Sequence, residues 1–138
     1  FHRLPGDEPE KDNTLQKGEL ITEIELPKPK YTKHYYYLKI RERSSYAFAM
    51  TSVAAGLVVK SGVITDAALA MGAVAHKPWK LTKAEAFLTG KKPSGENFAK
   101  AAEIAMQDAK PLEHNAYKIE MGKKAIVRSL TQAFERKA

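Results

Sequence analysis

A stretch that alternates between two kinds of side chain, residues 34–43, constrains the fold of this chain more than any other. Successive residues of a β-strand point to opposite faces of the sheet, so this alternation predicts a strand with two different faces. One face carries the apolar and ring side chains that can seal a core, namely His34, Tyr36, Leu38 and Ile40. The other face carries rings and cations, namely Tyr35, Tyr37, Lys39, Arg41 and Arg43.

The second face allows two interpretations. Rings stack and cations offset negative charge, so the face can present a flat, positive surface to a planar, electron-rich or anionic partner. In the plainer interpretation the strand is half buried and its lysine and arginine side chains are simply solvated.

Residues 19–26 also alternate and predict a strand, which we expect to pair antiparallel with residues 34–43. Pro27 and Pro29 end this strand and force a short loop. On the acidic face Ile21 is a lone large aliphatic side chain among glutamates. Such a residue is usually a tolerated surface residue, but it can also serve as an apolar plate for a ring.

The next two strands are expected to form a hairpin. A long strand is predicted over residues 47–59, Ser61 and Gly62 supply a tight turn, and a second strand runs through Val74. The small side chains of residues 67–75 indicate close packing, most simply against helices.

The second half of the sequence changes to the helical period. Thr82 and Glu85 form a capping-box pattern at the start of a short helix that is expected to stop at Gly90. Ser94 is expected to cap a second helix, which Pro111 ends. The inner face predicted for this second helix is Phe98, Ala101, Ala102, Ala105 and Ala109.

A third helix is expected over residues 115–137. Its apolar side chains recur at helical spacing and are Ile119, Ile126, Val127, Leu130 and Phe134. Gly122 lies inside this helix, where glycine costs about 1 kcal/mol relative to alanine, so it is expected to mark a close helix crossing.

This order, strands first and helices second, predicts an α+β fold in which an antiparallel sheet of three or four strands is followed by a three-helix layer. Residues 1–18 are polar and rich in turn residues and are expected to form an irregular lead-in. Residues 19–138 are expected to form a single domain, with strands over 19–75 and helices over 82–137.

The charge of the chain favours anionic partners but does not choose among them. The 23 lysine and arginine residues against 16 aspartate and glutamate residues give a net charge of +7. The sequence has no cysteine and no glycine-rich phosphate-binding motif, and its four histidines are far apart. No run of about 18 apolar residues predicts a membrane span.

Several stretches carry a resemblance to a known family. In chain order they are FHRLPG at 1–6, GELITEIELP at 18–27, YLKIRERSSYAFA at 37–49, SVAA at 52–55, MGAVAHKPWK at 71–80 and AEA at 84–86. Together they resemble the C-terminal domain of the FAD-binding subunit of molybdenum hydroxylases, the group that includes xanthine dehydrogenase and carbon monoxide dehydrogenase flavoproteins. The sequences of residues 43–49 and 76–79 are most similar to those of the bacterial aldehyde oxidoreductase branch.

The resemblance implies a cofactor and partners. An N-terminal domain, missing from this chain, would hold most of the FAD, and this chain would cover the isoalloxazine end. Leu20 and Ile21 fall where the family places aliphatic side chains against the flavin, and Lys39 falls where it has a lysine near the ring. The molybdenum cofactor and iron–sulfur clusters would belong to partner subunits or domains.

Other points stay open at this stage. The electron acceptor is unknown, because Tyr46 aligns where the xanthine dehydrogenase branch has an acidic residue near the flavin, which puts NAD use in doubt. The compartment, cytoplasmic or periplasmic, is also unknown. One alternative function is a single-stranded nucleic-acid-binding module that uses the face of Tyr35, Tyr37, Lys39 and Arg41. Another is an assembly domain whose helices dock partner subunits.

Overall fold

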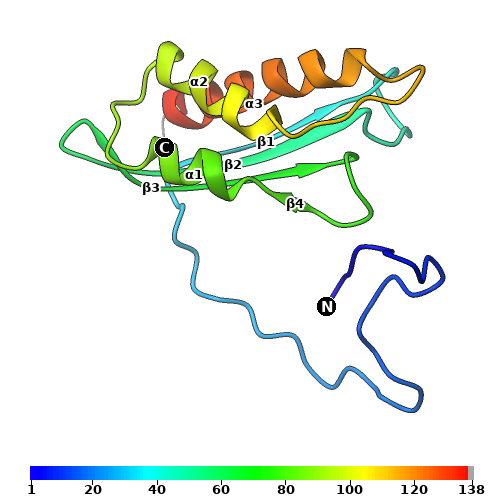
Figure 1. Ribbon diagram of the computed structural model, residues 1–138. Coiled ribbons are helices and arrows are strands. Elements are labelled where there is room, and N and C mark those ends of the chain that lie inside the picture. Colours follow the sequence, from blue (N-terminus) through cyan, green and yellow to red (C-terminus); the bar gives the residue numbers. More distant parts are fainter. Residues whose placement is uncertain (137–138) are drawn as a thin grey trace.

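The computed structural model describes residues 1–136 and shows an antiparallel sheet with helices packed on one of its faces (Figure 1). The four strands lie in the order β1-β2-β3-β4. Their bounds, in chain order, are β1 His34–Ile40, β2 Thr51–Lys60, β3 Val63–Gly72 and β4 Trp79–Lys80. The three helices are α1 Thr82–Leu88, α2 Gly95–Met106 and α3 Tyr117–Glu135. The predicted α+β class, with a sheet followed by a three-helix layer, is confirmed.

The hairpin between β2 and β3 forms where the sequence predicted it. Ser61 and Gly62 both have positive φ, at 50° and 75°, which matches the backbone twist of the tight turns that join antiparallel strands. The two strands are shorter than predicted, because β2 begins at Thr51 and β3 ends at Gly72.

The core lies between the sheet and the helices. On β1 the predicted inner face is confirmed, since Leu38 is buried while its neighbours Tyr37 and Lys39 are exposed. The central strands and all three helices supply the largest fully buried side chains, among them Leu57, Leu69, Met71, Leu88, Phe98, Ile126 and Leu130. This packing leaves the opposite face of the sheet without a covering layer (Figure 1).

The strand predicted over residues 19–26 is wrong. The structure has no strand in this segment, and the partner of β1 is β2, with Leu38 opposite Val53. Side chains of the segment stand in solvent, and Leu26 is 85% exposed. Alternating apolar and polar side chains are compatible with a β-strand, but a strand forms only where a neighbouring strand satisfies its backbone N–H and C=O groups. Within residues 1–136 no such neighbour lies beside this segment.

The capping box predicted for α1 is also wrong. Thr82 is the first helical residue, and the capping position, Leu81, contributes no side-chain hydrogen bond. The Glu85 carboxylate instead accepts a hydrogen bond from the Leu69 backbone N–H, with 2.8 Å between Oε1 and N. Leu81 N–H donates to the Leu69 carbonyl at 3.0 Å, so the chain enters α1 directly from the sheet.

The other two helices follow their sequence signals more closely. The Ser94 hydroxyl accepts a hydrogen bond from Asn97 N–H at 3.3 Å, so the predicted cap of α2 is confirmed. Ala109, predicted on its inner face, lies beyond the end of α2. The last helix begins at Tyr117, and its predicted end, Lys137, lies outside the described residues.

Gly122 marks the close crossing that the sequence predicted. A Cβ atom there would lie 3.0 Å from the Met106 methyl carbon and 3.2 Å from that of Met71. The glycine therefore lets α3 approach both α2 and the sheet.

Candidate functional site

The uncovered face of the sheet is the first candidate site. Tyr35, Tyr37 and Lys39 point to this side of β1, since the residues between them pack against α3. Tyr35 lies opposite Gly56 on β2, and Tyr37 lies opposite Ala54. We call this surface, with the β3 residues Ala68 and Ala70 beside it, the open face.

The open face is shallowly hollowed. The hollow has a volume of about 400 Å³ and is lined mainly by rings and by small side chains. Because alanine and glycine project little from a sheet, the floor is nearly flat and a planar group can lie against it. The exposed rings of Tyr35 and Tyr37, at 43% and 61%, stand at one side of this floor.

Tyr31 already places one ring on the open face. A Cβ atom at Gly56 would lie 2.6 Å from Tyr31 Cγ, so the ring fits only because residue 56 has no side chain. The Tyr31 hydroxyl donates a hydrogen bond to the Asp66 carboxylate, and Lys30 Nζ lies 2.8 Å from Asp66 Oδ2. These contacts fix the end of the N-terminal segment to the sheet.

The contacts among Lys30, Tyr31 and Asp66 shift two pKa values. Burial of the phenol, followed by its hydrogen bond to Asp66, raises the pKa of Tyr31 to about 12. The hydrogen bonds that Lys30 and Tyr31 donate lower the pKa of Asp66 below its ordinary value. The pair therefore keeps a neutral phenol and an ionised carboxylate over a wide pH range.

The structure brings only part of the predicted site together. Lys39 lies on the open face at the end of β1, opposite Ser52, and its side chain is exposed. Leu20 and Ile21, at 84% and 49% exposed, lie in the segment between the lead-in and β1, which runs away from the sheet (Figure 1). These two residues therefore do not form one site with Lys39 within this chain.

The loop between β1 and β2 borders the same end of β1. Tyr46 has a φ of 47°, and the Arg43 Nε–H donates to its backbone carbonyl at 3.0 Å. The side chains of Tyr46 and Phe48 are 93% and 98% exposed. The loop that follows this end of β1 therefore carries two unburied rings.

Sequence reasoning missed Tyr31 and half of the floor. The small residues of β3 were expected to pack against helices, but only Ala67, Leu69 and Met71 do so. Ala68 and Ala70 line the hollow of the open face instead. The alternation of large and small side chains along β3 was the available signal.

Other kinds of site find no support among residues 1–136. This part of the chain holds no group of three or more histidine, aspartate or glutamate side chains placed to bind a metal ion. It also holds no helix that is long and apolar enough to cross a membrane.

Comparison with known families gives one clear result. Residues 36–135 match the family described as CO dehydrogenase flavoprotein C-terminal domain. This match covers most of the chain, from within β1 to the end of α3. The resemblance drawn from the sequence motifs is confirmed.

Two curated proteins and two solved structures are similar. The aldehyde oxidoreductase FAD-binding subunit PaoB of Escherichia coli is 35% identical over 133 residues, which are 96% of this chain and 38% of that protein. The glyceraldehyde dehydrogenase medium chain of Sulfolobus acidocaldarius is 34% identical over 99 residues, which are 71% of this chain and 34% of that protein. This chain thus spans little more than a third of each relative.

The structures share the fold. Carbon monoxide dehydrogenase from Hydrogenophaga pseudoflava matches with a TM-score of 0.69 and 26% identity, over 76% of this chain and 38% of that chain. Quinoline 2-oxidoreductase from Pseudomonas putida matches with a TM-score of 0.67 and 26% identity, over 72% of this chain and 36% of that chain. None of these comparisons supports the nucleic-acid alternative.

Proposed function

Because the chain belongs to the CO dehydrogenase flavoprotein C-terminal domain family, we propose that it is the C-terminal part of an FAD-binding, electron-transferring subunit. The subunit would serve a molybdenum-dependent oxidoreductase of the xanthine or aldehyde dehydrogenase type. The observation that carries this proposal is the open face, where two exposed rings border a flat floor of small side chains and Lys39 follows Tyr37 on the same face of β1. The similarity to PaoB, an FAD-binding subunit, supports the proposal.

The residues present fit the ring end of a flavin. The floor accepts a planar ring, since Tyr31 already lies against Gly56. Lys39 is exposed on the same face of β1, two residues after Tyr37. When bound, FAD supplies the two-electron chemistry of the subunit. A cation beside the ring favours the form that carries more negative charge, so Lys39 would raise the potential of the flavin.

Leu20 and Ile21 would contribute through contact rather than charge. Their side chains are exposed in this chain. Contact with a flavin ring would remove apolar surface of the side chains and of the ring from water. The remainder of the cofactor, including its phosphates, would be held by an N-terminal domain.

The proposed partners are an iron–sulfur subunit and a molybdenum subunit of the same complex. The carbon monoxide dehydrogenase from Hydrogenophaga pseudoflava, which shares this fold, uses a molybdenum cofactor, and this similarity supports a molybdenum partner here. In this chain the open face lies on one side of the sheet and the helices on the other, so a flavin and a partner can be accommodated separately (Figure 1).

Replacement of Lys39 in the complete subunit tests the proposal. We expect Lys39→Met to lower the midpoint potential of the bound flavin, because it removes a positive charge near the ring, while thermal unfolding stays unchanged. Lys124→Met, an exposed cation on α3, is the matched control and should leave the potential unaltered. A subunit that purifies without flavin, or a potential that Lys39→Met leaves in place, would contradict the assignment.

A further inference from the structure

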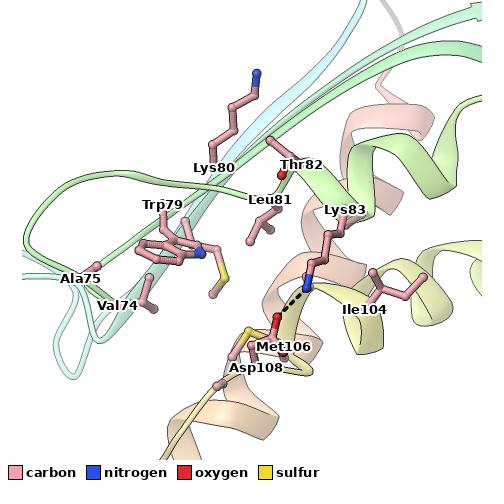
Figure 2. A pocket seen from close by; sticks show the side chains of 14 residues that line it. Val74, Ala75, Trp79, Lys80, Leu81, Thr82, Lys83, Ile104, Met106 and Asp108 are labelled. Atoms are coloured by element: carbon pink, nitrogen blue, oxygen red, sulfur yellow. Dashed lines mark hydrogen bonds and ion pairs between the residues drawn. The ribbon is translucent and has the colours of Figure 1, made fainter. Parts of the chain in front are cut away.

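A second hollow lies on the helix side of the sheet, away from the open face. It is a cavity of about 340 Å³ between β4, the loop before it, α1 and α2 (Figure 2). This volume falls at the lower end of the range for small-molecule pockets. The cavity is therefore large enough for one or two rings.

The cavity has a closed floor and partly open walls. Met71, Leu81 and Ala84 form a buried floor, each less than 5% exposed. The walls include Trp79 and Val74, which are 43% and 40% exposed. Large apolar side chains at the wall of a concave site leave apolar area in water, and a ligand that covers them gains about 25 cal/mol for each Å² removed.

The charges at the mouth compensate each other. Lys83 Nζ on α1 lies 2.7 Å from Asp108 Oδ2, just after the end of α2, and this pair spans one side of the cavity (Figure 2). Lys80 also borders the cavity, but its side chain points away from it, and it pairs with Glu85 at 3.7 Å (Figure 2). A charged ligand would have to compete with the Lys83–Asp108 pair, whereas an uncharged ligand would leave it intact.

We propose that this cavity binds an uncharged small molecule with an aromatic ring system. The ring would lie between Trp79 and the thioethers of Met71 and Met106, which adapt to flat ligands and make favourable contacts with rings. This site is distinct from the open face, so its test does not depend on the flavin assignment.

The four methionines of the chain provide the test. Met71 and Met106 line the cavity, whereas Met50 and Met121 do not and serve as internal references. We would label the methionine methyl groups of the 138-residue chain with ¹³C and titrate 2-naphthalenemethanol by NMR. We expect the Met71 and Met106 signals to move with a Kd below about 1 mM, while the Met50 and Met121 signals stay in place.

A matched anion tests the chemical class. 2-Naphthoate has the same ring system with one negative charge, and we expect it to bind at least about tenfold more weakly, which is about 1.4 kcal/mol. Equal affinity for the two probes would overturn the assignment to uncharged ligands. Methyl signals of Met71 and Met106 that do not move with either probe would overturn the site itself.

Filling the cavity tests its location. Ala105→Leu places extra carbon atoms in the cavity from α2 and should raise the Kd at least about tenfold. Ala86→Leu, on the exposed side of α1, is the control and should leave the Kd unchanged. If Ala105→Leu does not fold, contacts between probe protons and the Met71 and Met106 methyl groups in the unmodified chain decide the question, and their absence refutes the proposal.

Discussion

Replacement of Gly56 by alanine should destabilise the chain when residue 31 is tyrosine and stabilise it when residue 31 is alanine. The new Cβ atom would lie 2.6 Å from Tyr31 Cγ and 3.0 Å from Tyr31 Cβ, so the ring must leave its place on the sheet. When it leaves, the hydrogen bond from the Tyr31 hydroxyl to Asp66 breaks.

The magnitude follows from three contributions to the free energy of unfolding. A hydrogen bond to a charged group is worth about 1.5–3 kcal/mol. We reduce this to about 1 kcal/mol, since the Asp66 side chain is 33% exposed. Loss of ring burial adds about 1 kcal/mol. Alanine in a strand recovers about 0.5–1 kcal/mol relative to glycine. The net expectation for Gly56→Ala is destabilisation by about 1 kcal/mol.

In a Tyr31→Ala background the ring and its hydrogen bond are gone, and the remaining Cβ atom of residue 31, 3.0 Å from the new one, has to move by only a few tenths of an ångström. The strand preference then decides the sign. Gly56→Ala should then stabilise the chain by about 0.5–1 kcal/mol, which gives a coupling energy of about 2 kcal/mol between the two positions. Urea unfolding of the four variants measures this cycle. Gly95→Ala, where a Cβ atom meets nothing within 4 Å, controls for a simple loss of glycine. Equal effects of Gly56→Ala in both backgrounds would refute the reasoning.

Three further predictions concern pH and the contact between α1 and the sheet. The pKa of Tyr31 rises from 10.0 to about 12 on folding. Its contribution to the free energy of unfolding is therefore complete below pH 10 and is lost as the pH approaches 12. The urea midpoint should fall over this window, and it should fall less in Tyr31→Phe. The pKa of Asp66 is lowered from 3.8, so its contribution is present above that pH and should disappear on further acidification, which an acid titration of Asp66→Asn against the unmodified chain checks. Glu85→Ala removes the acceptor of Leu69 N–H and should destabilise the chain by about 1–3 kcal/mol in urea unfolding, whereas Glu85→Gln, which keeps an acceptor oxygen, should lose less.

Local chemistry explains the parts of the fold that the sequence predicted. The turn at Ser61 and Gly62 and the cap at Ser94 depend on residues within a few positions, and both formed as expected. The two faces of β1 also followed from alternation alone. Where distant groups compete, the prediction was wrong, as with Glu85, whose carboxylate binds a strand sixteen residues earlier instead of its own helix start.

The candidate site was predictable to the same extent. The face with Tyr35, Tyr37 and Lys39 was visible in the strand period. Tyr31 was not, because its role depends on Gly56 and on Asp66, which lies 35 residues further along the chain. The predicted flavin contacts of Leu20, Ile21 and Lys39 stay predictions.

The exposed apolar residues decide which measurement bears on the proposed function. Four apolar or aromatic side chains are each more than 80% exposed, so packing within this chain does not require their identity. They are Leu20 and Leu26 in the segment after the lead-in, and Tyr46 and Phe48 in the loop after β1. Both segments nevertheless carry motifs of the family resemblance. Any requirement for these side chains must therefore come from a group outside the chain, such as a cofactor or a covering domain. It follows that substitutions there should leave the stability of the 138-residue chain nearly unchanged, and only the flavin of the complete subunit can report on their role.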